Sequence, residues 1–578
     1  MRVATGLRLG PILRKTTETT ATVWVETDAP GTVQVRAGAA AASAETFTVH
    51  GHHYALCEVG GLAPDSAEPY TVEVDGERVW PPASSPHPPS LLRTLPASGA
   101  PVRLAFGSCR TPTDHSPGAV ARYGPDALRA YALRLSGRRA AAGGPAGEDE
   151  PTALLLIGDQ VYADELQPRM AAHLAEARRR APKERAAAAP PDGEVVFYDE
   201  YAELYRQTWT DPDVRWLLST VPSLMLFDDH DVRDDWNTSG SWRRDMDASP
   251  WWRQRIVSGL GSYWVYQHLG NLTAAQRAED PLFAEVRRAA AAGRDAGAEV
   301  DAAALRAHTE PQSTLWSHEH AVGGSRVLMV DARASRDVAD DADRSILGGP
   351  GGAWLDERLR GGTGHLIVAT TLPFLLPRAV HHLEGWNEAL CAGAWGGRLR
   401  GFAERLRRAL DLEHWAAFRR SFDAVAGALV QVAAGERGTP PATALLLSGD
   451  VHFSYLARAR PSRAAGGAAA AGRTVIAQLT SSPLCNRLPG KLRRAAWLST
   501  RRTPAAAGTV MARSVGVARS PLTWGLDEGP WFGNAVATLL LDGGRAEVHW
   551  SFAAQDRDSG SPLLEDGPVH VLTPPAPR

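Results

Sequence analysis

Short apolar stretches that run directly into polar loops recur along most of this chain, and they constrain its fold more than any other feature. Four of them have the length and composition of buried strands, and helical stretches of sequence separate them. Alternation of strands with helices is typical of an α/β sheet. The stretches are residues 102–106, 153–157, 223–227 and 444–447, with a fifth at 326–330. The sequence therefore predicts a layered-sheet domain of the α/β (α+β) class.

The first hundred residues have a different pattern, in which apolar side chains occupy alternate positions. Such alternation predicts short, half-buried strands. Asp75 and Gly76 separate two of these runs and suit the positive φ angles of a tight hairpin. Residues 62–65, followed by Tyr70, resemble the corner of fibronectin-type sandwiches. We therefore expect a small all-β sandwich of the fibronectin or immunoglobulin type at the N-terminus.

The Pro- and Ser-rich composition of segment 81–90 predicts a linker between the two regions. We expect an N-terminal β-sandwich over residues 1–97, the larger α/β domain over 98–555, and a C-terminal tail over 556–578. Ala-, Arg- and Leu-rich inserts have helical spacing and should cover the sheet. These inserts are residues 165–190, 274–308 and 398–436.

Charge and cysteine content narrow the classes of partner. A net charge of −3 on 578 residues argues against an obligate nucleic-acid partner, which needs a concentrated basic field. The chain has no run of about 18 apolar residues that could span a membrane, and its start lacks a signal-peptide pattern. Its four cysteines follow no short pairing pattern. We expect a cytoplasmic protein without a structural disulfide. A chain from which a signal peptide has been removed is the less favoured alternative.

The loops that follow the main strands carry residues that can bind metal ions. In an open α/β sheet, functional sites assemble at the carboxyl ends of the strands. Gly107, Gly158 and Gly449 stand beside the polar residues and permit a sharp turn. The loops read FGSCR (106–110), IGDQVYADE (157–165), FDDHDVRDDWN (227–237) and LSGDVHFSY (447–455). We expect these four loops to converge on one site.

Taken singly, most of these signals are weak. A buried cysteine such as Cys109 is usually core filler, and a lone His452 is more often structural than a ligand. The run from Asp228 to Asp231 is harder to explain without a ligand, because its three carboxylates repel one another unless a cation lies among them. Four such loops in succession favour a metal site.

These motifs, in this order, resemble the alkaline phosphatase D (PhoD-type) family of the calcineurin-like metallophosphoesterase superfamily. Ordinary metallophosphoesterases carry D-x-H, G-D-x-x-D, G-N-H-[DE] and G-H-x-H. Here Cys109, Tyr162, Asp229 and Asp450 stand at positions where the PhoD-type branch departs from those patterns. The resemblance covers residues 102–550 and implies a metallophosphoesterase-type layered sheet. The N-terminal sandwich is also similar to one that precedes many members.

The resemblance implies a dinuclear centre that holds ferric iron (Fe3+) and calcium (Ca2+). Anionic donors from Cys109 and Tyr162, with Asp159 and Asp450, suit a Lewis-acidic ferric ion. Asp159 can bridge two ions through its two oxygens. Asp229 and its acidic neighbours offer hard oxygens to a second ion, which the family implies is calcium. The remaining metal candidates are Asp228 and His452.

Three further residues are candidates for catalysis. His230 matches the histidine of the G-N-H-[DE] motif, so the resemblance places it near the leaving oxygen as a general acid or charge stabiliser. Arg333 and Arg336 lie in a segment similar to D-x-R-x-x-R of the family. Their guanidinium groups either contact the phosphate or brace the acidic loops. Asp234, Asp235 and Asn237 either complete the shell of the second ion or cap the following helix.

The resemblance implies a hydrolase of phosphoric mono- or diesters with a small phosphate ester as substrate. One alternative is a phosphodiesterase of the phospholipase D or teichoic-acid-degrading kind. An alternative of another class is a binding protein on a catalytically silent scaffold, which the presence of every metal position disfavours. The physiological substrate and the oligomeric state stay open.

Overall fold

The first nine strands form two antiparallel sheets that pack face to face. One sheet has the order β1-β2-β6-β5, and the other has the order β4-β3-β7-β8, with β9 paired to β7. An apolar core that includes Val23, Val35 and Val72 fills the space between them. The strands are β1 (Leu7–Thr16), β2 (Ala21–Thr27), β3 (Thr32–Ala37), β4 (Ala40–Glu45), β5 (Phe47–Val49), β6 (His52–Val59), β7 (Ala67–Val74), β8 (Glu77–Trp80) and β9 (Leu91–Arg93). This computed structural model describes residues 6–145, 147, 150–182, 185, 190, 193–338, 344–465 and 474–573.

The predicted hairpin is confirmed. Val74 of β7 pairs with Glu77 of β8, and the two residues between them, Asp75 and Gly76, have φ angles of 50° and 84°. The fibronectin-type corner is not found at Tyr70, however. In that corner the tyrosine hydroxyl bonds to nearby backbone of its own domain. The Tyr70 hydroxyl instead donates to the carbonyl of Ser219 in the larger domain, at 2.7 Å.

The segment 81–90 is a loop within the N-terminal region, and its prediction as a linker is wrong. The chain returns after it as β9, in which Leu91 pairs with Pro69 of β7. Trp216 of α6 (Pro212–Thr220) donates to the carbonyl of Pro88 at 2.8 Å and holds the loop against the larger domain. Proline content predicts irregular backbone, but it does not reveal whether the chain leaves the sheet afterwards.

The larger domain contains two central sheets. The first has the order β12-β11-β10-β20-β21-β22, and the second has the order β13-β14-β15-β16-β18-β17-β19. The first comprises β10 (Val102–Gly107), β11 (Ala153–Ile157), β12 (Ser223–Leu226), β20 (Ala535–Asp542), β21 (Arg545–Gln555) and β22 (Pro562–Val571). The second comprises β13 (His318–Val322), β14 (Ser325–Val330), β15 (His365–Thr370), β16 (Thr443–Ser448), β17 (Ser454–Pro461), β18 (Val475–Thr480) and β19 (Leu522–Trp531). All five predicted strands are present.

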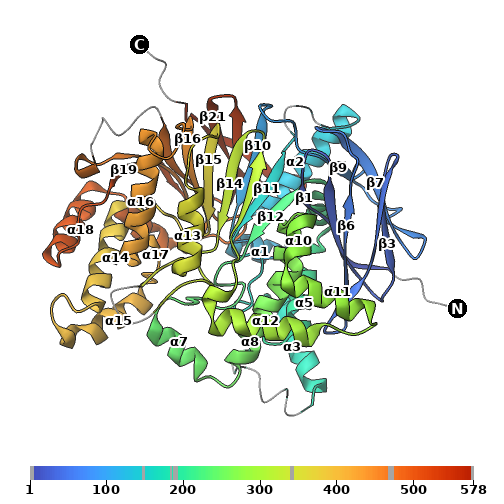
Figure 1. Ribbon diagram of the computed structural model, residues 1–578, viewed down its shortest axis with the longest axis horizontal. Helices are drawn as coiled ribbons and strands as arrows, with labels where there is room; N and C mark the ends of the chain where they lie inside the picture. Colours follow the sequence, from blue (N-terminus) through green and yellow to red (C-terminus); the bar gives the residue numbers. More distant parts are fainter. Residues whose placement is uncertain are drawn as a thin grey trace.

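The sheets pack against each other and carry helices on their outer faces (Figure 1). Residues such as Leu104 and Ile157 of the first sheet share one apolar core with Ile367 and Leu445 of the second. Helices α2 (Ala127–Ala142), α5 (Tyr198–Trp209), α6 and α8 (Trp252–Tyr263) supply the core outside the first sheet. Helices α13 (Gly348–Arg358) and α16 (Arg419–Ala434) supply the core outside the second. The mixed α/β class with layered sheets is therefore confirmed.

The inserts are mainly helical where the structure describes them. They form α3 (Pro168–Arg180), α10 (Ala274–Glu279), α11 (Pro281–Ala291), α12 (Gly297–Thr309), α15 (Arg400–Ala409) and α16. Helices α14 (Arg378–Cys391), α17 (Gly490–Ser499) and α18 (Arg502–Ser514) lie together beside the second sheet (Figure 1). Among the described residues, no helix combines the length and the apolar character needed to cross a bilayer.

The C-terminal segment differs from the expected tail. Its strand β22 pairs with β21 and forms the edge of the first sheet. Leu564 of this strand is buried in an apolar core to which α2 contributes, and this packing holds the segment against the larger domain. Residues 574–578 of the expected tail lie outside the described residues.

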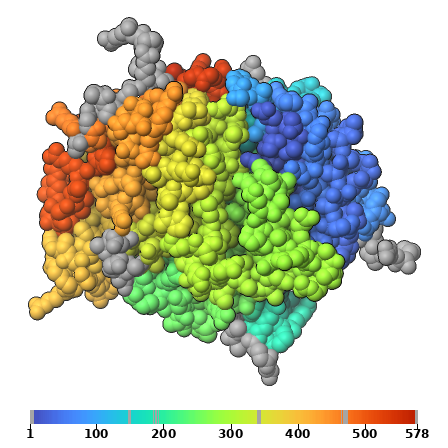
Figure 2. Space-filling view, viewed as in Figure 1, coloured from blue at the N-terminus to red at the C-terminus, as the bar shows by residue number. Residues whose placement is uncertain are grey.

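The N-terminal sandwich lies directly against the green helical segments of the larger domain (Figure 2). The contact is polar as well as apolar. Arg14 is fully buried and donates to the Asn271 side chain at 3.0 Å, and the Trp24 indole donates to the carbonyl of Val265 at 3.1 Å. Side chains from both regions share one apolar core. We infer that the two regions stabilise each other.

Replacement of Trp24 by alanine should lower the free energy of unfolding by about 3–5 kcal/mol, because it removes a fully buried indole from this shared core. Equilibrium denaturation of the metal-loaded protein measures the change. Trp497 is 46% exposed and serves as the matched control, with an expected loss below about 1 kcal/mol. Equal losses for the two variants would contradict a stabilising interface.

Candidate metal centre

The predicted loops converge where the two sheets meet. Strands β10, β11 and β12 are parallel neighbours, and so are β14, β15 and β16, so their carboxyl ends share one edge. Three groups of side chains there have ligand atoms within 4.8 Å of one another. The groups are Cys109, Asp159 and His452; Asp159, Asp229 and His230; and Asp228, Asp229 and Asp450. Asp159 and Asp229 each belong to two groups, so the groups form one continuous site.

The backbone beneath these residues is strained. Cys109, Asp159, Asp450 and His452 have φ angles of 57°, 49°, 66° and 55°, a region that L-residues other than glycine rarely adopt. Such outliers cost of order 1–3 kcal/mol each and cluster at functional sites. They turn four side chains from the ends of three strands, β10, β11 and β16, toward one point.

The neighbouring glycines have two different roles. Gly158 has a φ of 92° and makes the sharp turn that the sequence predicted. Gly107 and Gly449 do not have a positive φ, and for both the prediction of a sharp turn is wrong. A Cβ atom at Gly449 would lie 2.0 Å from the Ser108 hydroxyl oxygen, so this glycine allows two strand-end loops to approach each other closely.

Each of three buried carboxylates leaves one oxygen without a hydrogen-bond partner. Asp159 accepts from the Tyr162 hydroxyl on Oδ2 at 3.5 Å, and its Oδ1 has no partner among the described residues. Asp228 Oδ2 and Asp229 Oδ1 are likewise buried and unpartnered in the described part of the chain. Unpaired buried anions are costly, and a cation is their usual partner. These oxygens fit a metal ion.

Burial also changes the proton affinity of the candidate ligands. It raises the pKa of Asp159 well above the usual value, with a further contribution from the negative charges of Asp228 and Asp229. Burial, followed by the nearby Asp159, likewise raises the pKa of the Cys109 thiol. Burial lowers the pKa of His452 to about 4, which keeps its imidazole neutral, as a metal ligand must be. A bound cation would favour the ionised forms of Asp159 and Cys109.

Arg333 lies at the centre of the acidic cluster. Its fully buried guanidinium pairs with Asp228, with Asp229 at 3.3 Å, with Asp450 at 3.4 Å and with Glu413 at 2.6 Å. It takes one oxygen of Asp228 and one of Asp229, which leaves the two unpartnered oxygens described above. Of the two roles that the sequence left open for Arg333, the geometry favours bracing the acidic loops.

Arg336 pairs with Glu413 and, among the described residues, forms no ion pair with the aspartates that Arg333 contacts. It is fully buried and donates to Glu413 Oε2 at 3.1 Å and to the carbonyl of Ala332 at 2.7 Å. All of its contacts are with the protein's own loops, including the carbonyl of Asn237 at 3.3 Å. This placement favours a bracing role and gives Arg336 no position from which to contact a phosphate.

His230 is oriented by a carboxylate that the sequence analysis did not single out. Its Nδ1 lies 2.9 Å from Asp164 Oδ1, and its ring packs at a tilt against Tyr162 with centroids 4.6 Å apart. Burial disfavours the charged ring, but the carboxylate of Asp164 holds the pKa of His230 well above its usual value. Nε2 lies 3.7 Å from Asp234 Oδ1, and a ring nitrogen of His230 lies within 4.8 Å of ligand atoms of Asp159 and Asp229. Asp164 therefore holds Nδ1, whereas within the described residues Nε2 has only the longer contact with Asp234.

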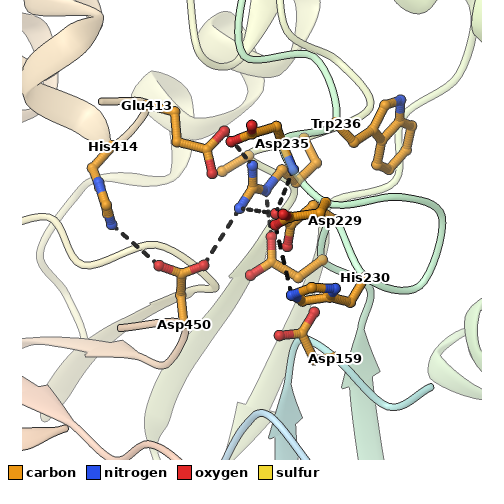
Figure 3. A network of polar contacts seen from close by, with 12 residues as sticks. Asp159, Asp229, His230, Asp235, Trp236, Glu413, His414 and Asp450 are labelled. Carbon is orange, nitrogen blue, oxygen red and sulfur yellow. Dashed lines mark hydrogen bonds and ion pairs between the residues drawn. The ribbon is translucent and has the colours of Figure 1, made fainter. Parts of the chain in front are cut away.

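Asp450 lies between His414 and a guanidinium group, as Figure 3 shows. Its Oδ1 faces Arg333, and its Oδ2 lies 3.1 Å from His414 Nε2. The Nδ1 atom of His414 lies 2.7 Å from Glu384, which is fully buried. Asp450 groups with Asp228 and Asp229, whereas His452 groups with Cys109. The sequence analysis had paired Asp450 with Cys109 and had missed His414, Glu384 and Glu413.

The other acidic-loop residues have local roles. Asp231 accepts from the backbone N–H of Asp228 at 2.9 Å and from Gln267 at 3.0 Å, so it shapes the loop. Asn237 donates to the carbonyl of Arg333 at 3.1 Å. The backbone N–H of Asp235 donates to Asp229 Oδ2 at 3.1 Å. These contacts hold the loop that carries Asp229.

Comparisons with known proteins agree with this architecture. The chain matches the family description "PhoD-like phosphatase" over residues 138–514 and "domain of unknown function (DUF7800)" over residues 4–92. None of the curated proteins compared with it is significantly similar. A solved structure described as "Structure of PhoD" shares the fold with a TM-score of 0.59 at 12% identity, covering 98% of this chain and 90% of that one.

The family match covers most of the candidate site. It includes Asp159, Tyr162, the run 228–231 and Asp450, whereas Cys109 precedes it. The match also spans more than half of the chain, as the motif resemblance had predicted. The chain therefore belongs to the PhoD-like phosphatase family.

Proposed function

We propose that this protein is a metal-dependent phosphoesterase with a dinuclear centre. One observation carries the proposal: Asp159, Asp228 and Asp229 each present a buried oxygen that lacks a partner in the described structure, all at the meeting point of the strand ends. Two neighbouring cations would satisfy these oxygens. A structural salt-bridge cluster would instead pair both oxygens of each carboxylate, as Asp450 does.

The donor chemistry favours two different ions. Cys109, Asp159, Tyr162 and His452 would hold ferric iron, because thiolate, phenolate and imidazole suit a Lewis-acidic transition metal. Asp228 and Asp229 offer only carboxylate oxygens, which suit calcium. Asp159 would lie between the two ions. When bound, the ions supply Lewis-acid polarisation of a phosphoryl group and activation of water at moderate pH.

The chain's own residues would then position the substrate and move a proton. Nε2 of His230 would donate a proton to the leaving oxygen, while Asp164 holds the ring through Nδ1. Arg333 would keep Asp228 and Asp229 in place against their mutual repulsion. His414, held by Glu384, would fix the orientation of Asp450. The substrates are phosphoric monoesters, diesters or both.

The proposal is tested by measuring the hydrolysis of nitrophenyl phosphate and bis(nitrophenyl) phosphate by protein whose metal content has been determined. We expect turnover of at least one ester, and we expect iron and calcium to co-purify. Removal of the metals by a chelator should abolish turnover, and their return should restore it. Metal-free protein that retains full turnover would contradict the proposal.

The ferric assignment predicts a visible absorption band, because thiolate or phenolate bound to ferric iron absorbs by charge transfer. Cys109→Ser and Tyr162→Phe should each weaken or shift the band in the iron-loaded protein. Cys57→Ser is the matched control, since Cys57 is buried in the N-terminal sandwich and should leave the spectrum unchanged. A colourless, fully active protein that contains only zinc or magnesium would show the assignment to be wrong.

A further inference from the structure

A second charged cavity lies outside the metal centre. It has a volume of about 520 Å³ and is bounded by α7 (Gly240–Asp247), α14, α15 and the start of α16. Its lining is strongly basic, with six arginines against two glutamates. The charged residues are Arg244, Arg344, Arg400, Arg407, Arg419, Arg420, Glu388 and Glu404. Basic linings of this kind attract anions.

Two of these arginines are almost fully buried and incompletely paired. Arg344 is 6% exposed and Arg407 is 3% exposed. Two nitrogens of each, Nε and Nη1 of Arg344 and Nε and Nη2 of Arg407, have no hydrogen-bond partner within the described residues. A buried donor left unpaired costs about 1–3 kcal/mol, and more when it is charged. Four such donors in one cavity call for an anionic partner.

The two glutamates of the cavity do not fill this role. Glu404 accepts from the Ser241 hydroxyl at 2.6 Å and pairs with Arg407 through Nη1 alone, at 3.0 Å. Glu388 accepts from the backbone N–H of Arg419 at 3.0 Å. Neither forms an ion pair with Arg344 in the part of the chain that the structure describes. The unpaired nitrogens of Arg344 and Arg407 therefore remain available to a ligand.

Buried residues separate this cavity from the metal centre. Arg344 donates to the carbonyl of Thr238 at 2.8 Å, and the Thr238 hydroxyl donates to Glu413 at 2.6 Å. Glu413 in turn pairs with Arg333 of the acidic cluster. Thr238 is fully buried and Glu413 nearly so. A ligand in the cavity and a substrate at the metal centre would thus occupy different sites.

We propose that the cavity is a second anion-binding site, which takes a phosphate group either as the free ion or on a small organic molecule. Guanidinium groups bind phosphate oxygens through paired, charge-assisted hydrogen bonds, and Arg344 and Arg407 offer two donors each. The volume lies within the range of small-molecule sites, so an organic group can accompany the phosphate. This site is additional to the phosphoesterase centre.

The cavity contains a natural reporter of its own occupancy. Cys391 lines it and is partly exposed, whereas Cys57, Cys109 and Cys485 are buried. A maleimide should therefore react with the metal-loaded protein first at Cys391. Phosphate bound at the metal centre cannot shield the Cys391 thiol, because the buried side chains of Thr238 and Glu413 lie between the metal centre and the cavity.

Saturation of the cavity should slow the alkylation of Cys391. At a ligand concentration ten times its Kd, the rate constant should fall about tenfold, since only the unoccupied fraction reacts. Inorganic phosphate and a propylphosphonate, which cannot be hydrolysed, are the two probes. Protection by both would assign the site to the phosphate group itself, whereas protection by the phosphonate alone would assign it to an organic phosphate. Absence of protection by either probe at saturating concentration would overturn the proposal.

Three variants sharpen the test. Arg407→Gln should abolish protection while hydrolysis of nitrophenyl phosphate continues, and Arg408→Gln, on the same helix but paired with Asp245 at the surface, should leave protection unchanged. Glu388→Gln should strengthen protection, because it removes a negative charge from the cavity and keeps the acceptor for Arg419. A gain in affinity cannot arise from misfolding. Unchanged affinity in both Arg407→Gln and Glu388→Gln would refute the site.

Discussion

Replacement of Asp159 by alanine should abolish hydrolysis and remove metal from the protein. Asp159 belongs to two of the three ligand groups, one with Cys109 and His452 and one with Asp229 and His230. Its Oδ1 is one of the oxygens without a partner in the described part of the chain. Removal of a residue that only hydrogen-bonds to a metal ligand costs about 10–100-fold in metal affinity or activity. Removal of a ligand such as Asp159 should therefore lower both by more than about 100-fold. Metal analysis after gel filtration, together with kcat/KM for a nitrophenyl ester, measures both effects.

The same variant should change stability in opposite directions with and without metal. Burial, with Asp228 and Asp229 nearby, raises the pKa of Asp159 in the folded protein. The unfolded chain therefore ionises at lower pH, so Asp159 destabilises the metal-free fold progressively as pH rises above the ordinary value for an aspartate. At neutral pH, metal-free Asp159→Ala should be at least as stable as metal-free wild type.

With metal the order should reverse. A ligand at 100 times its Kd stabilises the protein that binds it by about 2.7 kcal/mol, and the variant loses this contribution. Thermal unfolding in metal and in chelator, for wild type, Asp159→Ala and the surface control Asp566→Ala, checks the reversal. A variant that is destabilised equally in both conditions would show that Asp159 is structural and that the proposed centre is wrong.

Much of the site could be predicted because each motif follows its own strand. Strands β10, β11, β12 and β16 consist mainly of apolar residues, so they stand out in the sequence, and parallel pairing brings their carboxyl ends together. The residues after them, such as Asp159 and Asp228, therefore had to meet. This inference needed only local patterns and one general rule of sheet topology.

The partners that come from inserts could not be found in this way. Glu384 lies within α14 and His414 lies just before the helical turn at 415–417, so neither belongs to the loops that directly follow the predicted strands. Only the packing of α14 against the segment around 415–417 brings them together. Asp164 could have been predicted from the sequence, because it lies two residues after Tyr162 in a loop that the sequence analysis had already identified.

The role of Arg333 shows a different limit. Its position after β14 was predicted, but the sequence did not say which of two anions it would meet, a phosphate or a protein carboxylate. That choice depends on Glu413, whose carboxylate pairs with Arg333 at 2.6 Å, so that Arg333 faces protein carboxylates. Composition likewise marked 81–90 as irregular without showing that β9 returns to the sandwich.

Replacement of His230 by alanine should slow hydrolysis of alkyl phosphates by about 10²–10⁴-fold, the usual contribution of a general acid. The loss should be much smaller for nitrophenyl esters, since nitrophenolate leaves without a proton. Both metals should stay bound, because in the proposed mechanism Nε2 serves the leaving group. Parallel kinetics with the two ester types and metal analysis measure these effects. His549→Ala, in strand β21 and 35% exposed, is the matched control.

The geometry also permits the opposite assignment, and the experiment separates the two. His230 has ligand atoms within 4.8 Å of those of Asp159 and Asp229, and a carboxylate on the far nitrogen orients metal-bound histidines as well as catalytic ones. Asp164→Asn removes the charge that raises the pKa of His230, so the variant should lose activity on alkyl esters at a lower pH than wild type does. If His230→Ala loses metal as completely as Asp159→Ala, or slows both ester types equally, then His230 is a ligand and the proton must come from another group.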